Sequence, residues 1–312
     1  MIYIEMYGRL GNQFFRYAAA RAVQLKYYPD EKLCFNFQQI DDLHQTDPSF
    51  YNVLADFNVA DYETYHKGGK VLKNESSFCQ KMVCAFYYRG LRKIETPKMT
   101  EQVEYEHKWL SVLNKYGIYW FRTGFCQIAK SKSKNKFLSG GFESPQYFDE
   151  IRDILLKELQ PKQPLIPKNA ELFEKINQTN SICLSVRRGD FESNSKIKAL
   201  HSVCHQDYFL KAIEIIKQKV QNPVFFLFSD DIEWVKANIH TECETYYEDG
   251  TDPVWEKLRL MSACKHFIIS NSTFSWWCQW LSTNPDKVVV SPSHWFNNDY
   301  VSPLILDDWI KI

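Results

Sequence analysis

Residues 266–281, HFIISNSTFSWWCQWL, constrain the fold of this chain more than any other stretch. A short apolar run leads into small hydroxyl and amide residues and then into an aromatic-rich segment, which predicts a strand, a turn and a helix. Backbone N–H groups and hydroxyls at the start of such a helix bind anions well. The alternative is a capped, buried helix whose tryptophans fill the core, and two other segments decide between these interpretations.

The second half of the sequence alternates strand patterns with helix patterns. Strands are expected at residues 181–186, 224–229, 266–270 and 287–291, and helices at residues 207–220, 231–239, 254–265 and 273–282. This alternation is typical of a doubly wound parallel sheet. Ligands of such sheets bind beyond the carboxyl ends of the strands, so the residues that follow each strand are the candidates for a site.

The first half opens in a related way, with a strand, a glycine-containing turn, a helix and a second strand expected at residues 2–7, 8–12, 13–26 and 32–37. Further strands are expected at residues 118–126 and 137–141 and a helix at 145–159, whereas residues 38–100 give no clear pattern. Residues 160–167 contain three prolines and form a stiff linker. We therefore expect an α/β chain of two Rossmann-like domains, residues 1–160 and 161–312.

Composition excludes several classes of protein. Lys plus Arg and Asp plus Glu both number 38, which gives no sign of bulk nucleic-acid binding. The nine cysteines include no CxxC pair, which favours reduced thiols in the cytoplasm. No cluster has the spacing of a metal site, and no apolar run approaches the roughly 20 residues of a membrane-spanning helix.

Arg187 and Arg188 directly follow the apolar strand pattern at residues 181–186. Two arginines at the end of a buried strand are costly unless an anion meets them, and the guanidinium fork matches phosphate oxygens. The alternative is one arginine paired with Asp190 and the other in solvent. At a strand end of a doubly wound sheet, we favour the anion.

Asp230 and Asp231 follow the next strand, at residues 224–229. One carboxylate can accept hydrogen bonds from a base or a ribose, and the other can cap the helix at residues 231–239. The turn at residues 271–273 follows a third strand. Three strands are thus each followed by residues that can bind phosphate or ribose, and this combination predicts a nucleotide-diphosphate site. The glycine turn at residues 8–12 is a weaker signal, placed where a second domain could close on the ligand.

Three motifs resemble those of the α-1,2-fucosyltransferase family, glycosyltransferase family 11: residues 8–13 (GRLGNQ), 187–191 (RRGDF) and 270–281 (SNSTFSWWCQWL). Residues 141–148 (GFESPQYF) and 291–295 (SPSHW) resemble two further segments of that family, in the same order along the chain. The resemblance implies a GT-B-like fold, with GDP-β-L-fucose in the C-terminal half and much of the acceptor site in the N-terminal half. It implies inverting, metal-independent transfer of fucose to O2 of a terminal β-galactoside, and the sequence contains no Asp-x-Asp.

Carried over by residue, the resemblance places Arg187 and Arg188 on the diphosphate, Asp230 or Asp231 on the guanosine, residues 271–275 on phosphate oxygens and Asn12 near the donor from the other domain. The implied donor-binding residues are Gly8, Arg9, Gly11, Asn12, Arg187, Arg188, Asp230, Asp231, Asn271, Ser272, Thr273 and Ser275. The implied catalytic residues are Arg187, Arg188, Asp190 and Asn12. Ser185 departs from the family pattern, which has histidine there.

Several residues are candidates for the general base. Asp190 leads by position, although it can instead orient Arg187 or Arg188, and Glu5, Glu143 and His294 are further candidates. The alternative functions are transfer of another GDP-sugar, a different linkage, or non-catalytic glycan or nucleotide binding. We expect no cofactor and no metal, and GDP-fucose and a β-galactoside glycan as partners. We also expect a cytoplasmic location, at the inner membrane face or free, as in bacterial surface-glycan or O-antigen synthesis.

Overall fold

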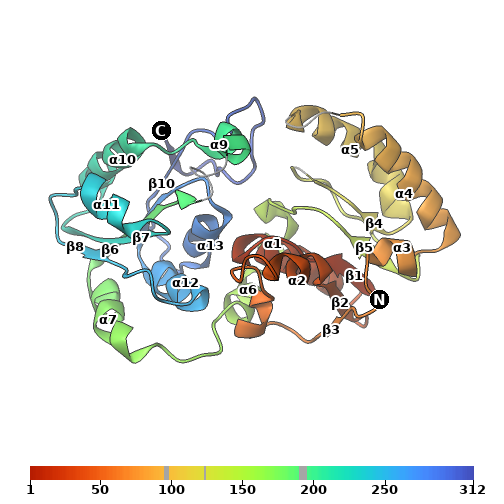
Figure 1. Cartoon of the computed structure of the whole chain (residues 1–312), viewed down its shortest axis with the longest axis horizontal. Helices are drawn as coiled ribbons and strands as arrows, with labels where there is room; N and C mark the ends of the chain where they lie inside the picture. Colours follow the sequence, from red (N-terminus) through yellow and green to blue (C-terminus); the bar gives the residue numbers. More distant parts are fainter. Residues whose placement is uncertain (95–97, 123, 190–194) are drawn as a thin grey trace. The chain divides into compact units, whose positions relative to one another are not determined.

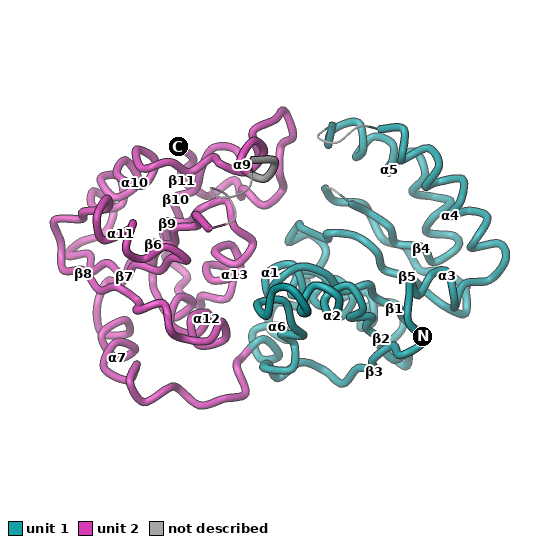
Figure 2. Tube along the Cα trace, viewed as in Figure 1, with its two compact units in different colours: residues 1–159 teal, residues 160–312 magenta. Residues whose placement is uncertain are grey.

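Each half of the chain builds one parallel β-sheet in the computed structural model, which describes residues 1–94, 98–122, 124–189 and 195–312 (Figure 1). The chain divides into two units, residues 1–159 and 160–312 (Figure 2). Within the described residues, every strand pairing of both sheets is parallel. Two consecutive Rossmann-like units with parallel sheets confirm the expected α/β, GT-B-like fold class.

The sheet of unit 1 has the strand order β3-β2-β1-β5-β4. Its strands are β1 (Ile2–Glu5), β2 (Leu33–Asn36), β3 (Tyr62–Thr64), β4 (Ile118–Tyr119) and β5 (Lys136–Leu138). Its α-helices are α1 (Leu10–Tyr27), α2 (Gln38–His44), α3 (Val71–Glu75), α4 (Phe78–Leu91), α5 (Met99–Lys115) and α6 (Arg152–Glu158). Figure 1 shows α1 and the α4–α5 pair on opposite sides of this sheet.

The sheet of unit 2 has the strand order β11-β10-β9-β6-β7-β8. Its strands are β6 (Asn180–Val186), β7 (Pro223–Ser229), β8 (Thr245–Tyr247), β9 (His266–Ile269), β10 (Val289–Ser291) and β11 (Ile310–Lys311). Its α-helices are α7 (Ala170–Gln178), α9 (Ser195–His201), α10 (Gln206–Lys219), α11 (Ile232–Asn238), α12 (Val254–Ala263) and α13 (Thr273–Leu281). Counted along the chain, this is the 3-2-1-4-5-6 order of a dinucleotide-binding Rossmann sheet.

Unit 2 is doubly wound because its helices cover both faces of the sheet. Figure 1 shows α10 and α11 on one side and α7, α12 and α13 on the other. The central strands β6, β7 and β9 are buried on both faces, which explains why β7 and β9 are largely continuous apolar runs rather than alternating ones. Ile182, Leu184, Phe225, Leu227 and Ile268 belong to one core cluster with helix residues. This core fixes the strand ends that carry the candidate site.

Three expectations about local structure in unit 1 were wrong. The glycine turn ends at Arg9, which is the extended N-cap residue of α1, so Gly11 and Asn12 lie in the first helical turn. The strand expected at residues 118–126 ends at Tyr119, since the backbone N–H groups of Arg122 and Cys126 donate to the side chains of Glu106 and Tyr147. These donors are therefore not available for strand pairing.

The single helix expected at residues 145–159 is divided. Two 3₁₀ turns, Pro145–Tyr147 and Asp149–Ile151, precede α6, and Phe148 between them has a non-helical backbone with φ −145° and ψ −1°.

Among the helices that the structure describes, none has both the length and the apolar character needed to cross a bilayer. The nine cysteines carry free thiols.

Candidate active site

The strand ends of unit 2 that the sequence singled out meet at one edge of the sheet. β6 is the first strand of the unit and lies between β7 and β9. The chain runs outward from β6 to β7 and β8 and then crosses to β9 on the other side, so the strand order reverses between β6 and β9. Ligands of open α/β sheets bind at this reversal. Arg187 and Arg188 follow β6, and the turn that begins α13 follows β9.

The two arginines are held by the two aspartates that follow β7. Arg187 Nη1 lies 2.8 Å from Asp230 Oδ2, and Arg188 Nε lies 3.1 Å from Asp231 Oδ2. The backbone N–H of Arg188 also donates to Asp230 Oδ1 at 2.9 Å. Both arginine side chains are about a quarter exposed, so they contact protein carboxylates and also reach solvent. An anionic ligand can therefore approach them without displacing buried groups.

Asp231 has two roles, one of which the sequence predicted. Its Oδ1 accepts the backbone N–H of Trp234 at 3.3 Å and caps α11, as expected. Its Oδ2 meets Arg188, whose guanidinium carbon lies 3.8 Å from the centre of the Trp234 ring. A cation over an indole face is held electrostatically as well as by packing. The Arg188 side chain is thus fixed from two sides.

The turn between β9 and α13 combines buried and accessible polar groups. Asn271 is buried, and its Nδ2 donates to the carbonyl oxygens of His201 at 2.8 Å and Trp295 at 3.0 Å. Ser272 is the N-cap residue of α13 and makes no side-chain capping hydrogen bond. Ser272 and Thr273 are partly exposed, so of the predicted residues of this turn they are the ones that a ligand can reach. Asn271 instead holds the turn in place.

Ser185, where the family pattern has histidine, lies in a buried hydroxyl network. Its Oγ is 2.7 Å from Ser275 Oγ, which in turn is 3.4 Å from Ser270 Oγ. All three serines are buried, and they join β6, the end of β9 and the first turn of α13. A histidine would not fit this network without rearrangement, because the imidazole is much larger than a hydroxymethyl group. The departure from the family pattern therefore has a local structural counterpart in this chain.

In unit 1, the glycine motif shapes the start of α1. Gly8 has φ +74°, and a Cβ there would lie 2.8 Å from Asn12 Cβ, so a larger residue is excluded both by backbone strain and by space. Gln13 is fully buried, and its Nε2 donates to the carbonyl oxygens of Gly8 at 3.0 Å and Tyr51 at 2.8 Å. Its Oε1 accepts the N–H of Val53 at 3.2 Å. The motif thus fixes a loop beyond β1.

Arg9 points to a neighbouring loop of the same unit. Its Nη2 lies 3.0 Å from Asp47 Oδ2, its Nε donates to Ser49 Oγ at 2.9 Å, and its guanidinium carbon lies 4.7 Å from the centre of the Phe50 ring. The Arg9–Asp47 ion pair is about 40% exposed, so the guanidinium remains open to solvent. Gly8, Arg9, Gly11 and Asn12 are brought together at the amino end of α1. Asp190, the remaining predicted residue, lies outside the described residues.

Sequence reasoning missed two side chains of these sites. Trp234 lies three residues after Asp231, and its indole face receives Arg188. Arg16 lies four residues after Asn12 on the same face of α1, and it is fully buried near the carboxyl end of β1. The i, i+4 spacing from a motif residue is the signal that could have found Arg16. Nothing in the sequence separates Trp234 from the other tryptophans.

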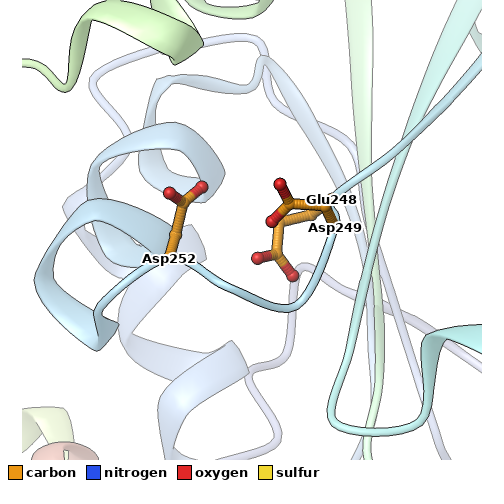
Figure 3. Close-up of side chains that lie close together, drawn as sticks. All are labelled: Glu248, Asp249 and Asp252. Atoms are coloured by element: carbon orange, nitrogen blue, oxygen red, sulfur yellow. The ribbon is translucent and has the colours of Figure 1, made fainter.

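Three carboxylates gather on the segment between β8 and α12, and none of them is among the predicted residues. Glu248, Asp249 and Asp252 lie close to one another there (Figure 3). Lys168 Nζ lies 3.0 Å from Asp249 and 2.9 Å from Asp252, and Lys257 Nζ lies 3.3 Å from Glu248. Ammonium groups thus neutralise this cluster from within the unit. We assign it a structural role in joining the segment before α7 to α12.

Comparisons with known proteins agree with these motifs. A family model described as "Glycosyl transferase family 11" matches residues 1–312. The O-antigen biosynthesis glycosyltransferase WbnK of Escherichia coli is 29% identical over 323 residues, which cover all of both chains. An α-1,2-colitosyltransferase of Escherichia coli is 31% identical over 194 residues, which cover 58% of this chain and 66% of that protein.

Human galactoside α-(1,2)-fucosyltransferase 1 is 30% identical over 100 residues, which cover 31% of this chain and 27% of that protein. The family model spans both units, and the motifs that carried the resemblance lie at the strand ends and helix starts described above. The chain belongs to glycosyltransferase family 11.

Proposed function

We propose that this glycosyltransferase moves L-fucose from GDP-β-L-fucose to O2 of a terminal β-galactoside, with inversion to an α-1,2 linkage. The observation that carries the proposal is the pair Arg187 and Arg188, ordered by Asp230 and Asp231 at the strand-order reversal of a Rossmann sheet. Relatives named as α-1,2-transferases, one of them acting on galactosides, support the linkage and the acceptor class.

In this proposal, unit 2 binds the donor. Arg187 and Arg188 bind the diphosphate oxygens, and the first N–H groups of α13 together with Ser272 and Thr273 supply further donors. Asp230 and Asp231 each offer about four acceptor positions. Their contacts with the arginines therefore leave lone pairs that can accept hydrogen bonds from the guanosine.

The chemistry follows from charge. As the bond between the anomeric carbon and the β-phosphate oxygen breaks, GDP takes the electron pair and its negative charge grows. Two guanidinium groups and a helix N-terminus stabilise that charge without a metal ion. The sugar passes through an oxocarbenium-like state, and the acceptor oxygen attacks the opposite face while its proton passes to a base.

The direct test is a transfer assay with GDP-fucose and a panel of β-galactosides in the presence of EDTA. We expect a product whose linkage NMR identifies as α-1,2, formed at the same rate with and without the chelator. A product with another linkage would refute the regiochemistry, and loss of activity in EDTA that added Mg²⁺ or Mn²⁺ restores would refute metal independence.

A second candidate is transfer of a colitosyl group to the same kind of acceptor, favoured by the similarity to the α-1,2-colitosyltransferase. Competition between GDP-fucose, GDP-colitose and GDP-mannose separates the two candidates. The donor with the highest kcat/KM identifies the natural sugar. A protein that binds GDP and glycans but transfers no sugar from any of these donors would instead be a non-catalytic binding protein.

Gly189→Ala is expected to weaken GDP binding about tenfold, which equals about 1.4 kcal/mol, close to the lower limit of about 1.5 kcal/mol for a hydrogen bond to a charged group. A Cβ at position 189 would lie 2.6 Å from Asp230 Oδ2, so the carboxylate would have to move away from Arg187 and from the Arg188 N–H. Isothermal titration calorimetry with GDP measures the effect.

The control for Gly189→Ala is the same substitution in an Asp230→Ala background. Without the carboxylate there is no clash, so the two substitutions together should cost little more than Asp230→Ala alone. Equal losses from Gly189→Ala in both backgrounds would show that the glycine acts through its backbone and not through Asp230.

A further inference from the structure

Arg16 is a buried cation that the donor site does not use. Its side chain is fully buried in α1, its Nη1 donates to the carbonyl oxygen of Asn12 at 2.8 Å, and its guanidinium carbon lies 3.0 Å from the centre of the Tyr7 ring. Its Nε and Nη2 atoms are buried and have no hydrogen-bond partner. Burial lowers the pKa of Arg16 to about 9. Unsatisfied buried donors cost free energy unless a ligand meets them.

Glu143 lies on the next strand connection at the same edge of the sheet. β1 pairs directly with β5, and Glu143 follows β5 by five residues. The intervening Phe142 is buried and has φ +54°, a conformation that is strained for a bulky side chain. Ser144, next in the chain, is fully buried and its Oγ has no hydrogen-bond partner. Strained backbone that presents unpaired polar groups is characteristic of functional sites.

The charges of Arg16 and Glu143 influence each other. Burial raises the pKa of Glu143 and the charge of Arg16 opposes this shift, whereas the charge of Glu143 raises the pKa of Arg16. Arg16 is the charged group whose field acts on Glu143. No ion pair or hydrogen bond joins these two described side chains. Arg16 thus keeps two buried donors without a hydrogen-bond partner, and Glu143 supplies an acceptor on the neighbouring strand connection. A donor and an acceptor placed in this way are suited to a small neutral ligand with hydroxyl groups.

The position in the fold supports a ligand site. The strand order of unit 1 reverses between β1 and β5, and Arg16 and Glu143 lie on the two segments that follow these strands. This is the edge at which open parallel sheets bind ligands. The pair carries one positive and one negative charge, so it favours a neutral sugar diol over a second phosphate.

The other base candidates in the described residues are already engaged or exposed. The carboxylate of Glu5 accepts Nδ2 of Asn36 and the backbone N–H of Val71, both at 2.8 Å, and thereby joins β1 to β2 and α3. His294 is exposed in unit 2, with Nδ1 3.3 Å from Ser293 Oγ. Glu143 is therefore the candidate with an uncommitted carboxylate beside unsatisfied donors.

We propose that Arg16 and Glu143 form the acceptor subsite, in which Arg16 binds one hydroxyl of the acceptor sugar and Glu143 removes the proton from the neighbouring, reacting hydroxyl. This inference rests on the proposed function. The acceptor oxygen forms the new bond to the anomeric carbon, the bond from that carbon to the β-phosphate oxygen breaks with its electron pair on GDP, and the hydroxyl proton moves to the Glu143 carboxylate. Arg16 is a positioning residue that also keeps Glu143 ionised.

The first test is Glu143→Gln, which keeps the shape of the side chain and removes the base. We expect kcat to fall about 100-fold or more, the scale of general base catalysis, while the Kd for GDP is unchanged. The acidic limb of the wild-type profile of kcat/KM against pH should disappear. The matched control is Glu150→Gln, an exposed carboxylate of the same connection, which should change neither kcat nor the pH profile.

The difference in free energy of unfolding between Glu143→Gln and wild type should change with pH in a definite direction. Because the folded pKa of Glu143 is raised, wild-type stability falls as pH rises from the unfolded value through the folded one. Glu143→Gln lacks this loss, so urea denaturation should show its free energy of unfolding rising relative to wild type over that window. A variant that loses stability but keeps the wild-type kcat and pH profile would show a structural glutamate and overturn the proposal.

The second test is Arg16→Gln, which keeps hydrogen-bonding capacity and removes the charge. We expect the KM for the acceptor to rise about tenfold, with the Kd for GDP unchanged, and the acidic limb of the pH profile to move to higher pH because Glu143 loses its cation. An unchanged acidic limb and an unchanged acceptor KM would overturn the role of Arg16.

Failure of the proposed function is distinguishable from failure of this inference. If the wild-type protein transfers no fucose, the donor assignment fails, and saturation-transfer NMR with methyl β-D-galactoside then compares wild type, Arg16→Gln and Glu143→Gln. Loss of sugar binding in both variants would sustain the subsite. Equal binding by all three proteins, or no binding by wild type, would overturn it.

Discussion

Arg187→Ala and Arg188→Ala are each expected to lower kcat at least about 100-fold, a cost of about 2.7 kcal/mol in the barrier on the scale of oxyanion-stabilising donors. Both arginines directly follow β6, a central strand of unit 2, and each guanidinium group lies within about 3 Å of an aspartate. Removing one leaves the growing charge of the leaving GDP with half of its cationic partners. Steady-state rates with saturating GDP-fucose and acceptor measure the effect.

Two controls make the result specific. Arg89→Ala removes an exposed arginine of α4 and should leave kcat unchanged. Arg187→Lys keeps the charge but not the planar fork, so its kcat should lie between wild type and Arg187→Ala. Near-normal kcat in both alanine variants would rule out the proposed stabilisation of the leaving group.

Trp276→Ala is expected to destabilise unit 2 by about 3–5 kcal/mol, the usual cost of truncating a buried aromatic side chain to alanine. Trp276 is fully buried on α13, and its Nε1 donates to the carbonyl oxygen of Leu304 at 2.9 Å. Its ring lies 5.3 Å from that of Trp277 in an edge-to-face arrangement. The substitution removes the packing and leaves a buried carbonyl group without its donor.

Urea denaturation followed by tryptophan fluorescence and circular dichroism measures this loss. Because the chain has two units, the transition of unit 2 is to be fitted separately from that of unit 1. Trp276→Phe keeps most of the packing and should cost less than Trp276→Ala, whereas Phe78→Ala, at an exposed position, should stay within about 0.5 kcal/mol. Equal midpoints for Trp276→Ala and wild type would contradict a core role for α13.

The central strands of unit 2 were predictable because burial on both faces leaves a continuous apolar run with a polar end. β6, β7 and β9 begin and end within one residue of their predicted bounds. The edge strands β3, β8 and β11 were not predicted, since each has two or three residues and is only partly buried. So short a segment shows no period, and tertiary pairing rather than local pattern makes it a strand.

The chemistry of the candidate site was only partly readable. The sequence indicates that Arg187, Arg188 and two aspartates follow neighbouring strands, but not which aspartate faces which arginine, because side-chain direction depends on the turn after each strand. Arg16 looks like a surface residue of an alanine-rich helix in sequence. Its burial follows from packing against the loop after β1, which no local pattern records.

The pairing of arginines with aspartates has a consequence for how donor affinity can change. A flexible side chain gives up about 0.5–1.5 kcal/mol of conformational entropy when a ligand immobilises it, but Arg187 and Arg188 are each held by a carboxylate of the protein itself. The loss of side-chain entropy is therefore part of the free energy of folding and is not added to the free energy of ligand binding. A screen for altered donor affinity should therefore recover substitutions at Asp230 and Asp231 as often as at the arginines, whether or not either carboxylate ever contacts the nucleotide.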